Sequence, residues 1–285
     1  MKRAAAAKGR KNTTAAAKPA GKRAGWRSAE KVEDAAGRQY HIGLAPGEVE
    51  RFILTCGDPA RAERIAKNFF DSVRLERRNR EFVTFTGTYR GIPLTVIATG
   101  IGCDNTEIAT IELAQIVERP TFIRVGTSGA LQDDIALGDL IISTGSVRLE
   151  NTSTWFVHEG FPAVAHYEIV GALVGAAKAL RAPHHIGITA TGSGFYGAQG
   201  RRGSGFEPRF PDLVGELSRM GVKNLEMETS TLFTLCAMRG FRAGAVCTAF
   251  ANRRENVFIA PDQKIAAEDR AILCGLKAFE SLARS

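Results

Sequence analysis

The sequence predicts an α/β protein built on a largely parallel or mixed β-sheet. Short apolar runs bounded by small or turn-forming residues are typical of buried strands, as in residues 52–56 and 243–250. Helical patterns follow several such runs and carry start or stop signals, such as Asp58-Pro59 before one helix and Gly221 after another. Alternation of strands and helices along a chain is typical of the α/β class.

These elements follow one another closely along the chain. The predicted strands are residues 52–56, 80–88, 93–99, 121–125, 139–144, 186–190 and 243–250. The predicted helices are residues 59–69, 104–118, 161–180, 211–220, a helix that ends at residue 238, and 263–283. Two of the strands flank the turn Arg90-Gly91 and are expected to pair. Asp104 and Glu107 are expected to cap their helix, and residues 192–211 are expected to form a mobile loop.

The positive charge is concentrated at the N-terminus. Residues 1–29 hold nine of the 38 Lys and Arg residues and none of the 30 Asp and Glu residues, so the rest of the chain is near neutral. Residues 1–36 have few large apolar side chains and are predicted to be a disordered basic tail. Residues 37–285 are predicted to be a single domain. A transit peptide and a nucleic-acid-binding arm are the alternatives for the tail.

The composition indicates a globular protein of a reducing compartment. No apolar run approaches the length of a membrane span, and the tail has no apolar core of a secretory signal. The cysteines are scattered without metal-type spacing at Cys56, Cys103, Cys236, Cys247 and Cys274. We expect them to be reduced core thiols, and we expect a cytoplasmic protein.

Two glycine motifs begin like dinucleotide fingerprints. Residues 100–106 lack the third glycine, and residues 192–197 match G-x-G-x-x-G but are followed by no predicted helix. The fingerprint requires a helix N-terminus that receives the pyrophosphate, so neither motif predicts a dinucleotide site.

Four groups of polar residues follow predicted strands, where α/β sheets collect ligand groups. Residues 57–61 and 124–128 each combine glycine amides with one arginine, which suits phosphate. Residues 195–201 offer an aromatic ring, an amide and a guanidinium, which suit a flat heterocycle. Residues 226–228 offer carboxylates that suit sugar hydroxyls. Taken singly, each group also fits a structural role as an ordinary turn, a solvated arginine or a helix N-terminal charge.

Together, these groups occur in the order of one family. The chain from His41 onward resembles the nucleoside phosphorylase family, in its pyrimidine-specific uridine phosphorylase branch. The resemblance rests on His41, Gly57-Asp58-Pro59 with Arg61, Arg80-Glu81-Phe82, Arg124-Val125-Gly126-Thr127, Phe195-Tyr196 with Gln199 and Arg201, and Glu226-Met227-Glu228. It implies a three-layer sandwich in which helices flank a central mixed sheet, with residues 37–285 as one catalytic domain. It also implies reversible, phosphate-dependent cleavage of uridine, with deoxyuridine left open, to uracil and ribose 1-phosphate.

The resemblance further implies the residue roles. Phosphate is expected to be held by Gly57, Arg61, Arg124 and Thr127. The ribose is expected to be held by Met227 and Glu228, and Glu226 is expected to belong to the same substrate site. The base is expected to stack on Phe195 and to be read at its edge by Gln199 and Arg201. The neighbouring subunit is expected to supply Arg80 to phosphate and His41 to the ribose 5′ hydroxyl. The catalytic residues among these are expected to be Arg124, Arg201 and Glu228.

The chemistry of uracil agrees with this assignment. An amide can accept from the uracil N–H and donate to one carbonyl oxygen, while an arginine donates to the other. Negative charge moves onto the base as the glycosidic bond breaks, so a hydrogen bond from Arg201 to the base stabilises the transition state more than the ground state. Phosphate is the co-substrate and the attacking group, so no organic cofactor and no side-chain nucleophile are expected. Residues 249–253 lack the Ser-Asp pair of purine-cleaving relatives, which disfavours purine nucleosides.

An oligomer and an interface cation follow from the same resemblance. A homodimer unit is implied because His41 and Arg80 are expected to act across an interface. In this family, three such dimers often form a ring. Some relatives bind a cation at this interface at positions that match Glu81, the Ile101 carbonyl and Asn105, the last being Ser in those relatives. K⁺ or Ca²⁺ would be the ion.

Three alternatives to a uridine phosphorylase remain open. Another nucleoside or pyrimidine phosphorylase would prefer a different substrate, and a nucleoside hydrolase of the same fold would need no phosphate. A nucleic-acid-binding protein would use the basic tail and would bind less tightly at high salt. The near-neutral body of the chain favours the enzyme.

Overall fold

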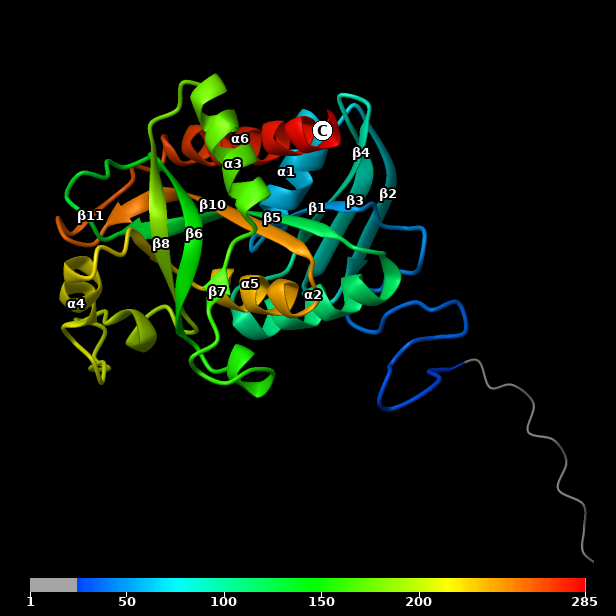
Figure 1. Cartoon of the computed structure of the whole chain (residues 1–285), viewed down its shortest axis with the longest axis horizontal. Coiled ribbons are helices and arrows are strands. Elements are labelled where there is room, and N and C mark those ends of the chain that lie inside the picture. The colour runs from blue at the N-terminus through cyan, green and yellow to red at the C-terminus, as the bar shows by residue number, and fades with distance from the viewer. Residues whose placement is uncertain (1–24, 285) are drawn as a thin grey trace, which may run out of the picture.

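The computed structural model describes residues 25–284 and shows a mixed β-sheet with helices packed on it (Figure 1). The helices are α1 (Pro59–Phe69), α2 (Cys103–Ile116), α3 (Tyr167–Ala179), α4 (Leu213–Arg219), α5 (Thr229–Met238) and α6 (Lys264–Arg284). The strands are β1 (Phe52–Cys56), β2 (Ser72–Asn79), β3 (Phe82–Tyr89), β4 (Ile92–Ala98), β5 (Thr121–Ala130), β6 (Leu140–Leu149), β7 (Ala163–Val164), β8 (His184–Gly192), β9 (Asn224–Glu226), β10 (Arg242–Asn252) and β11 (Val257–Phe258).

The long strand β5 lies at the centre of the sheet. The strand order is β11-β10-β6-β8-β9-β5-β1-β4-β3-β2, and β10 also pairs with β5, so five of the strands close into a ring. The strands β1, β4, β5 and β10 run parallel to one another. At one edge of the sheet, β3 pairs antiparallel with β4, and β2 pairs antiparallel with β3. Because the parallel strands share a direction, the loops that follow them meet at one edge of the sheet.

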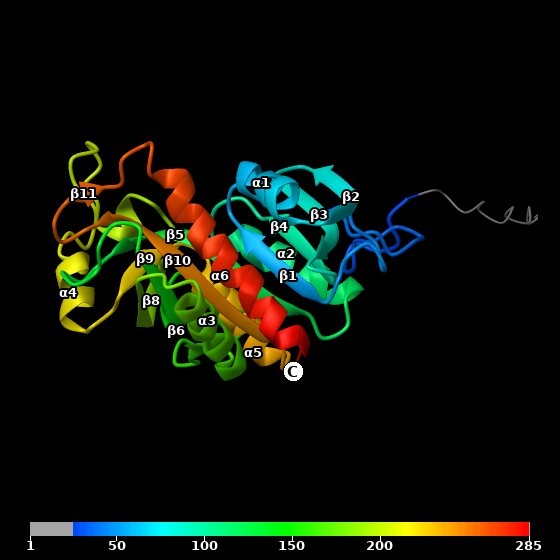
Figure 2. The ribbon, with the colours of Figure 1, turned by 90° about the horizontal axis from the view of Figure 1, so that it is seen from above.

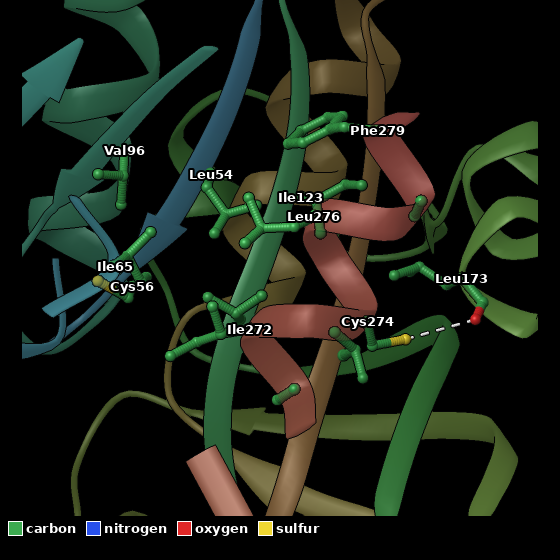
Figure 3. Packing of buried hydrophobic residues seen from close by; sticks show 14 of the residues in the cluster. Leu54, Cys56, Ile65, Val96, Ile123, Leu173, Ile272, Cys274, Leu276 and Phe279 are labelled. Carbon is green, nitrogen blue, oxygen red and sulfur yellow. Dashed lines mark hydrogen bonds between the residues drawn. The ribbon is translucent and has the colours of Figure 1, made fainter. Parts of the chain in front are cut away.

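Two groups of helices pack on the sheet. In Figure 1, α1, α3 and α6 lie on one side of it, and α2 and α5 lie together on the other. Figure 2 shows α6 crossing β5 and β10. In the core beneath α6, Ile272 and Leu276 lie beside Leu54 of β1 and Ile123 of β5 (Figure 3). A Cβ at Gly275 would lie 2.8 Å from a methyl carbon of Val125, so this glycine lets the helix approach the sheet closely.

Most of the predicted elements are confirmed, with three corrections. Strand β2 was not predicted, because its sequence SVRLERRN is largely charged and exposed, as is common for an edge strand. Residues 161–166 are not helical, since β7 lies there and α3 begins at Tyr167. The predicted cap at Asp104 is wrong, because the N-cap is Gly102 and the Asp104 carboxylate accepts a hydrogen bond from the Thr152 hydroxyl instead.

The cysteines are free and buried, and burial raises the pKa of each thiol. Of the predicted tail, residues 1–24 lie outside the described residues. Residues 25–36 form turns, and Glu33 makes an isolated β-bridge with Gln39. Among the described residues, no helix combines the length and the apolar character that crossing a membrane requires.

Candidate active site

A cavity of about 570 Å³ opens at the edge of the sheet where β1 and β5 end. Its lining includes ten of the twelve predicted substrate-binding residues: Gly57, Arg61, Arg124, Thr127, Phe195, Gln199, Arg201, Glu226, Met227 and Glu228. These residues come from segments far apart in the sequence, and the fold brings them to one place. An apolar wall completes the cavity and includes Phe250, Ala251 and Phe258.

Arg124 is the buried cation of this cavity. It projects from β5, where its Nε donates to Glu226 at 3.0 Å and its Nη2 donates to Glu228 at 2.5 Å. A Cβ at position 126 would lie 2.8 Å from Nη2 of Arg124, so Gly126 leaves the space that the guanidinium occupies. Burial alone would lower the pKa of Arg124, but the charges of Glu228 and Glu226 outweigh burial and raise it. Arg124 is therefore a permanent cation.

Glu226 and Glu228 share this single guanidinium. Glu226 also accepts the backbone N–H of Glu228 at 2.9 Å and that of Thr229 at 3.0 Å, at the start of α5. The Thr191 hydroxyl donates to it at 2.6 Å. Glu228 accepts the backbone N–H of Gly102 at 2.7 Å. Burial raises the pKa of Glu228, and the charge of Glu226 adds to this rise while Arg124 opposes it. When both carboxylates are ionised, negative charge exceeds positive charge in this part of the cavity.

Arg61 supplies a second buried cation. The Asp58 carboxylate caps α1 by accepting the Ala60 N–H at 2.8 Å, and Arg61 follows in the first turn. The guanidinium donates to Glu268 of α6 at 2.8 Å and to the Val125 carbonyl at 3.4 Å, while its buried Nε has no hydrogen-bond partner among residues 25–284. Burial is the largest influence on Arg61 and acts to lower its pKa, but the bond to Glu268 and the charges of Cys56 and Glu268 together raise it. Both guanidiniums line the cavity, and guanidinium groups are suited to bind phosphate oxygens.

The predicted base-reading residues lie together in the structure. The guanidinium carbon of Arg201 lies 3.9 Å from the centre of the Phe195 ring, and its Nε donates to the Phe195 carbonyl at 2.9 Å. Its Nη2 lies 3.3 Å from the side-chain oxygen of Gln199, which is itself buried. Burial lowers the pKa of Arg201. An aromatic ring, an amide and a guanidinium therefore meet at one wall of the cavity.

Arg253 belongs to the same neighbourhood and was not predicted. It follows the end of β10 and donates through Nη2 to the Gln199 carbonyl at 3.1 Å. Its Nη1 is buried and has no hydrogen-bond partner in the described part of the chain. Burial, with a smaller effect of the Arg201 charge, lowers its pKa to about 10. Its position after a strand end is the signal that could have revealed it, since the other cationic groups follow the same rule.

His41 and Arg80 do not line the cavity of their own chain. Nδ1 of His41 lies 2.7 Å from the Glu112 carboxylate, and Arg80 donates to the Tyr40 hydroxyl at 2.7 Å. The rings of Tyr40 and His41 meet edge to face at 4.8 Å. The two residues therefore lie on either side of one ring, that of Tyr40, and outside the cavity that the other ten line.

The residues predicted to hold an interface cation gather around Gly100. A Cβ built at Gly100 would lie 2.6 Å from the Asn105 amide nitrogen and 3.6 Å from Cγ of Glu81, and Ile101 is the next residue. Glu81 and Ile101 also line the cavity. Among the described residues, no three His, Cys, Asp or Glu side chains are grouped to hold a metal ion. A cation here would depend on one carboxylate and on neutral oxygen atoms.

The fold is that of a known class of proteins. The chain belongs to the phosphorylase superfamily, whose family model matches residues 51–276. Among its relatives, the uridine phosphorylase of Thermococcus kodakarensis is 47% identical over 242 residues, which cover 84% of this chain and 87% of the relative. The uridine phosphorylase of Escherichia coli is 43% identical over 221 residues, which cover 76% of this chain and 87% of the relative. The guanosine phosphorylase of Halorubrum lacusprofundi is 35% identical over 233 residues, which cover 81% of this chain and 89% of the relative.

Proposed function

We propose that this chain is a uridine phosphorylase, a pentosyltransferase that converts uridine and phosphate to uracil and ribose 1-phosphate. The observation that carries the proposal is the content of one cavity. It combines two buried arginines, a pair of carboxylates and the base-reading wall of Phe195, Gln199 and Arg201. Uridine phosphorylases among the relatives, at 38–47% identity, support the same activity. The enzyme would serve pyrimidine nucleoside catabolism and salvage.

Inorganic phosphate is the attacking group in this proposal. Arg61 and Arg124 would neutralise it, and the Gly57 amide and the Thr127 hydroxyl would complete its site. A phosphate oxygen forms a bond to C1′ of the ribose as the bond from C1′ to the uracil nitrogen breaks. The electron pair of the broken bond moves onto uracil. Arg201 donates to a carbonyl oxygen of the departing base, and Gln199 pairs with its edge, so that both interactions strengthen as charge develops.

The carboxylates act on the ribose in the same step. The ribose becomes more positive as the bond to uracil breaks, and Glu226 and Glu228 place excess negative charge beside it. Glu228 would accept a hydrogen bond from the 2′ hydroxyl and fix the orientation of the sugar, and Met227 would pack against the sugar. Orientation of this kind lowers the barrier because the reacting atoms need no further alignment.

The complete site would be shared between two subunits. Arg80 and His41 lie outside the cavity of their own chain, and both contact Tyr40, so they are placed together where they could serve a neighbour. We therefore propose a homodimer in which Arg80 reaches the partner's phosphate and His41 the partner's 5′ hydroxyl. A ring of three such dimers is the larger assembly that we expect.

A cation at that interface would be held by the Glu81 carboxylate, the Ile101 carbonyl and the Asn105 side-chain oxygen of each subunit. Calcium takes about six to eight oxygen ligands, usually with several carboxylates, so this mostly neutral set fits K⁺ better than Ca²⁺. Its chemistry would be structural, since it would join two subunits beside the cavity.

We propose that the sheet and the two groups of helices form a three-layer sandwich, which the placement of α1, α3 and α6 opposite α2 and α5 supports. We propose a cytoplasmic enzyme, for which the free, buried thiols are the support.

An assay of base release tests the proposed function. Purified protein is incubated with uridine or guanosine, each with and without phosphate, and the free base is measured by chromatography. We expect uracil from uridine only when phosphate is present, and no guanine. Uracil released equally without phosphate would identify a hydrolase, and faster release of guanine would identify a purine enzyme. Absence of any base release would refute an enzyme of this class.

A further inference from the structure

An aromatic cluster forms at the turn that carries Arg80. The rings of Trp26 and Tyr40 meet edge to face, with centres 5.0 Å apart and an angle of 87° between the ring planes. The guanidinium of Arg80 lies over the Tyr40 ring, with its carbon 4.8 Å from the ring centre. The same guanidinium donates to the Tyr40 hydroxyl at 2.7 Å. Trp26, Tyr40 and Arg80 are called the aromatic clamp below.

The segment before Tyr40 is folded so that it presents Trp26 to this clamp. The backbone N–H of Arg27 donates to the Glu33 carbonyl at 2.8 Å, and the Arg27 side chain donates to the Ala35 carbonyl at 2.6 Å. Glu33 also forms a β-bridge with Gln39. These bonds close the chain into a loop whose ends are Trp26 and Tyr40. Trp26, which lies in the predicted tail, therefore contacts Tyr40, and Tyr40 contacts the predicted site residue Arg80.

Arg80 has little else to hold it. It lies in the turn between β2 and β3 with a φ of 53°, a left-handed conformation that is uncommon for a residue with a side chain. Within residues 25–284 its guanidinium forms no ion pair with a carboxylate, and Tyr40 is the side chain on which it rests. Asn79 fixes the backbone of Tyr40 through its side-chain amide, which donates to the Tyr40 carbonyl at 3.1 Å. The Tyr40 ring is then held laterally by Trp26.

We propose that Trp26 is a positioning residue for phosphate. It fixes the Tyr40 ring, and the ring orients the Arg80 guanidinium before phosphate arrives. A long arginine side chain that is already ordered loses less rotamer freedom on binding, so the affinity for phosphate is higher. The contact with Tyr40 leaves the positive charge of Arg80 intact, because a ring attracts the cation without neutralising it. This inference rests on the proposed function, in which Arg80 serves the neighbouring subunit's cavity.

Steady-state kinetics of Trp26→Ala test the proposal. We expect the KM for phosphate to rise roughly threefold to tenfold, because this is the change in affinity that the loss of one aromatic pair can cause. We expect kcat to stay within about twofold of the wild type. Trp26→Phe keeps an edge-to-face partner for Tyr40 and should restore most of the phosphate affinity. Trp155→Ala is the matched control, because Trp155 is 82% exposed and does not line the cavity.

Several outcomes would overturn the proposal. An unchanged KM for phosphate in Trp26→Ala would do so, and so would a Trp26→Phe variant as impaired as Trp26→Ala. A fall in kcat with no change in KM would indicate a merely structural role and would likewise refute it.

A binding measurement separates this inference from the proposed function. The chain has two tryptophans, so in a Trp155→Phe variant the tryptophan fluorescence comes from Trp26 alone. We expect inorganic phosphate, titrated without any nucleoside, to change this emission, and we expect Arg80→Ala to abolish the change. An emission that phosphate leaves unaltered would refute the clamp, even if uridine is cleaved. A phosphate-dependent emission in a protein that does not cleave uridine would support the clamp and refute only the proposed activity.

Discussion

Arg201→Ala is expected to lower kcat/KM for uridine by about 10²- to 10³-fold, the range found when a donor to a developing negative charge is removed. Arg201 lies against the Phe195 ring and next to the Gln199 amide, at the wall of the cavity where the base would bind. In the proposed mechanism, its interaction with the uracil oxygen would be strongest once the bond to ribose is breaking. The loss should therefore appear in kcat as well as in KM.

The control for this variant is the next residue. Arg202→Ala removes an exposed arginine that pairs with Asp212 on the surface, and it should leave kcat/KM unchanged. Thermal unfolding of both variants should match the wild type, because the side-chain hydrogen bonds of Arg201 stay within its own loop. Near-normal turnover by Arg201→Ala would contradict the role in reading the base.

Replacing Arg124 by methionine is expected to lower kcat/KM for uridine by more than about 10³-fold, because phosphate loses a cation and the ribose carboxylates lose their common partner. It is also expected to destabilise the protein by about 3–5 kcal/mol, since two buried carboxylates would remain without a counter-ion. Both effects follow from the bonds of Arg124 to Glu226 and Glu228. Denaturant unfolding and steady-state kinetics measure them separately.

A second substitution distinguishes the two effects. In Arg124→Met with Glu228→Gln, one of the stranded charges is removed, so we expect part of the lost stability to return while the activity stays low. Glu228→Gln alone is the reference for activity, because it lacks the same carboxylate but keeps Arg124. If the double variant turned over uridine as fast as Glu228→Gln alone, the role of Arg124 would be structural and the phosphate site would lie elsewhere.

The sequence predicts the local parts of this fold well. Asp58-Pro59 signals the start of α1 correctly, because capping depends on residues that are adjacent in the chain. The strand β10 is predicted within a few residues, because its apolar run is buried in the middle of a sheet. By contrast, β2 has a charged sequence that no strand pattern matches, since an edge strand exposes most of its side chains.

The assembled site is harder to predict than the local elements from residue patterns alone. Arg124 and Glu226 are 102 residues apart, and their contact depends on the pairing of β5 with β9. No local pattern encodes that pairing. The position of these residues after strands predicts only that they gather at one edge of the sheet, and their individual roles depend on the resemblance to a family. The contact between Trp26 and Tyr40 was not predicted either, because a lone tryptophan in a basic segment carries no signal of what it packs against.

The central claim is that an oxygen atom of phosphate, and not one of water, attacks C1′ of uridine. It is tested most directly by incubating the protein with uridine and phosphate labelled with ¹⁸O at every oxygen, in unlabelled water, and by analysing the sugar product by mass spectrometry. We expect ribose 1-phosphate that retains all of the labelled oxygens, formed in equal amount to uracil. Free, unlabelled ribose accompanying the uracil would contradict it.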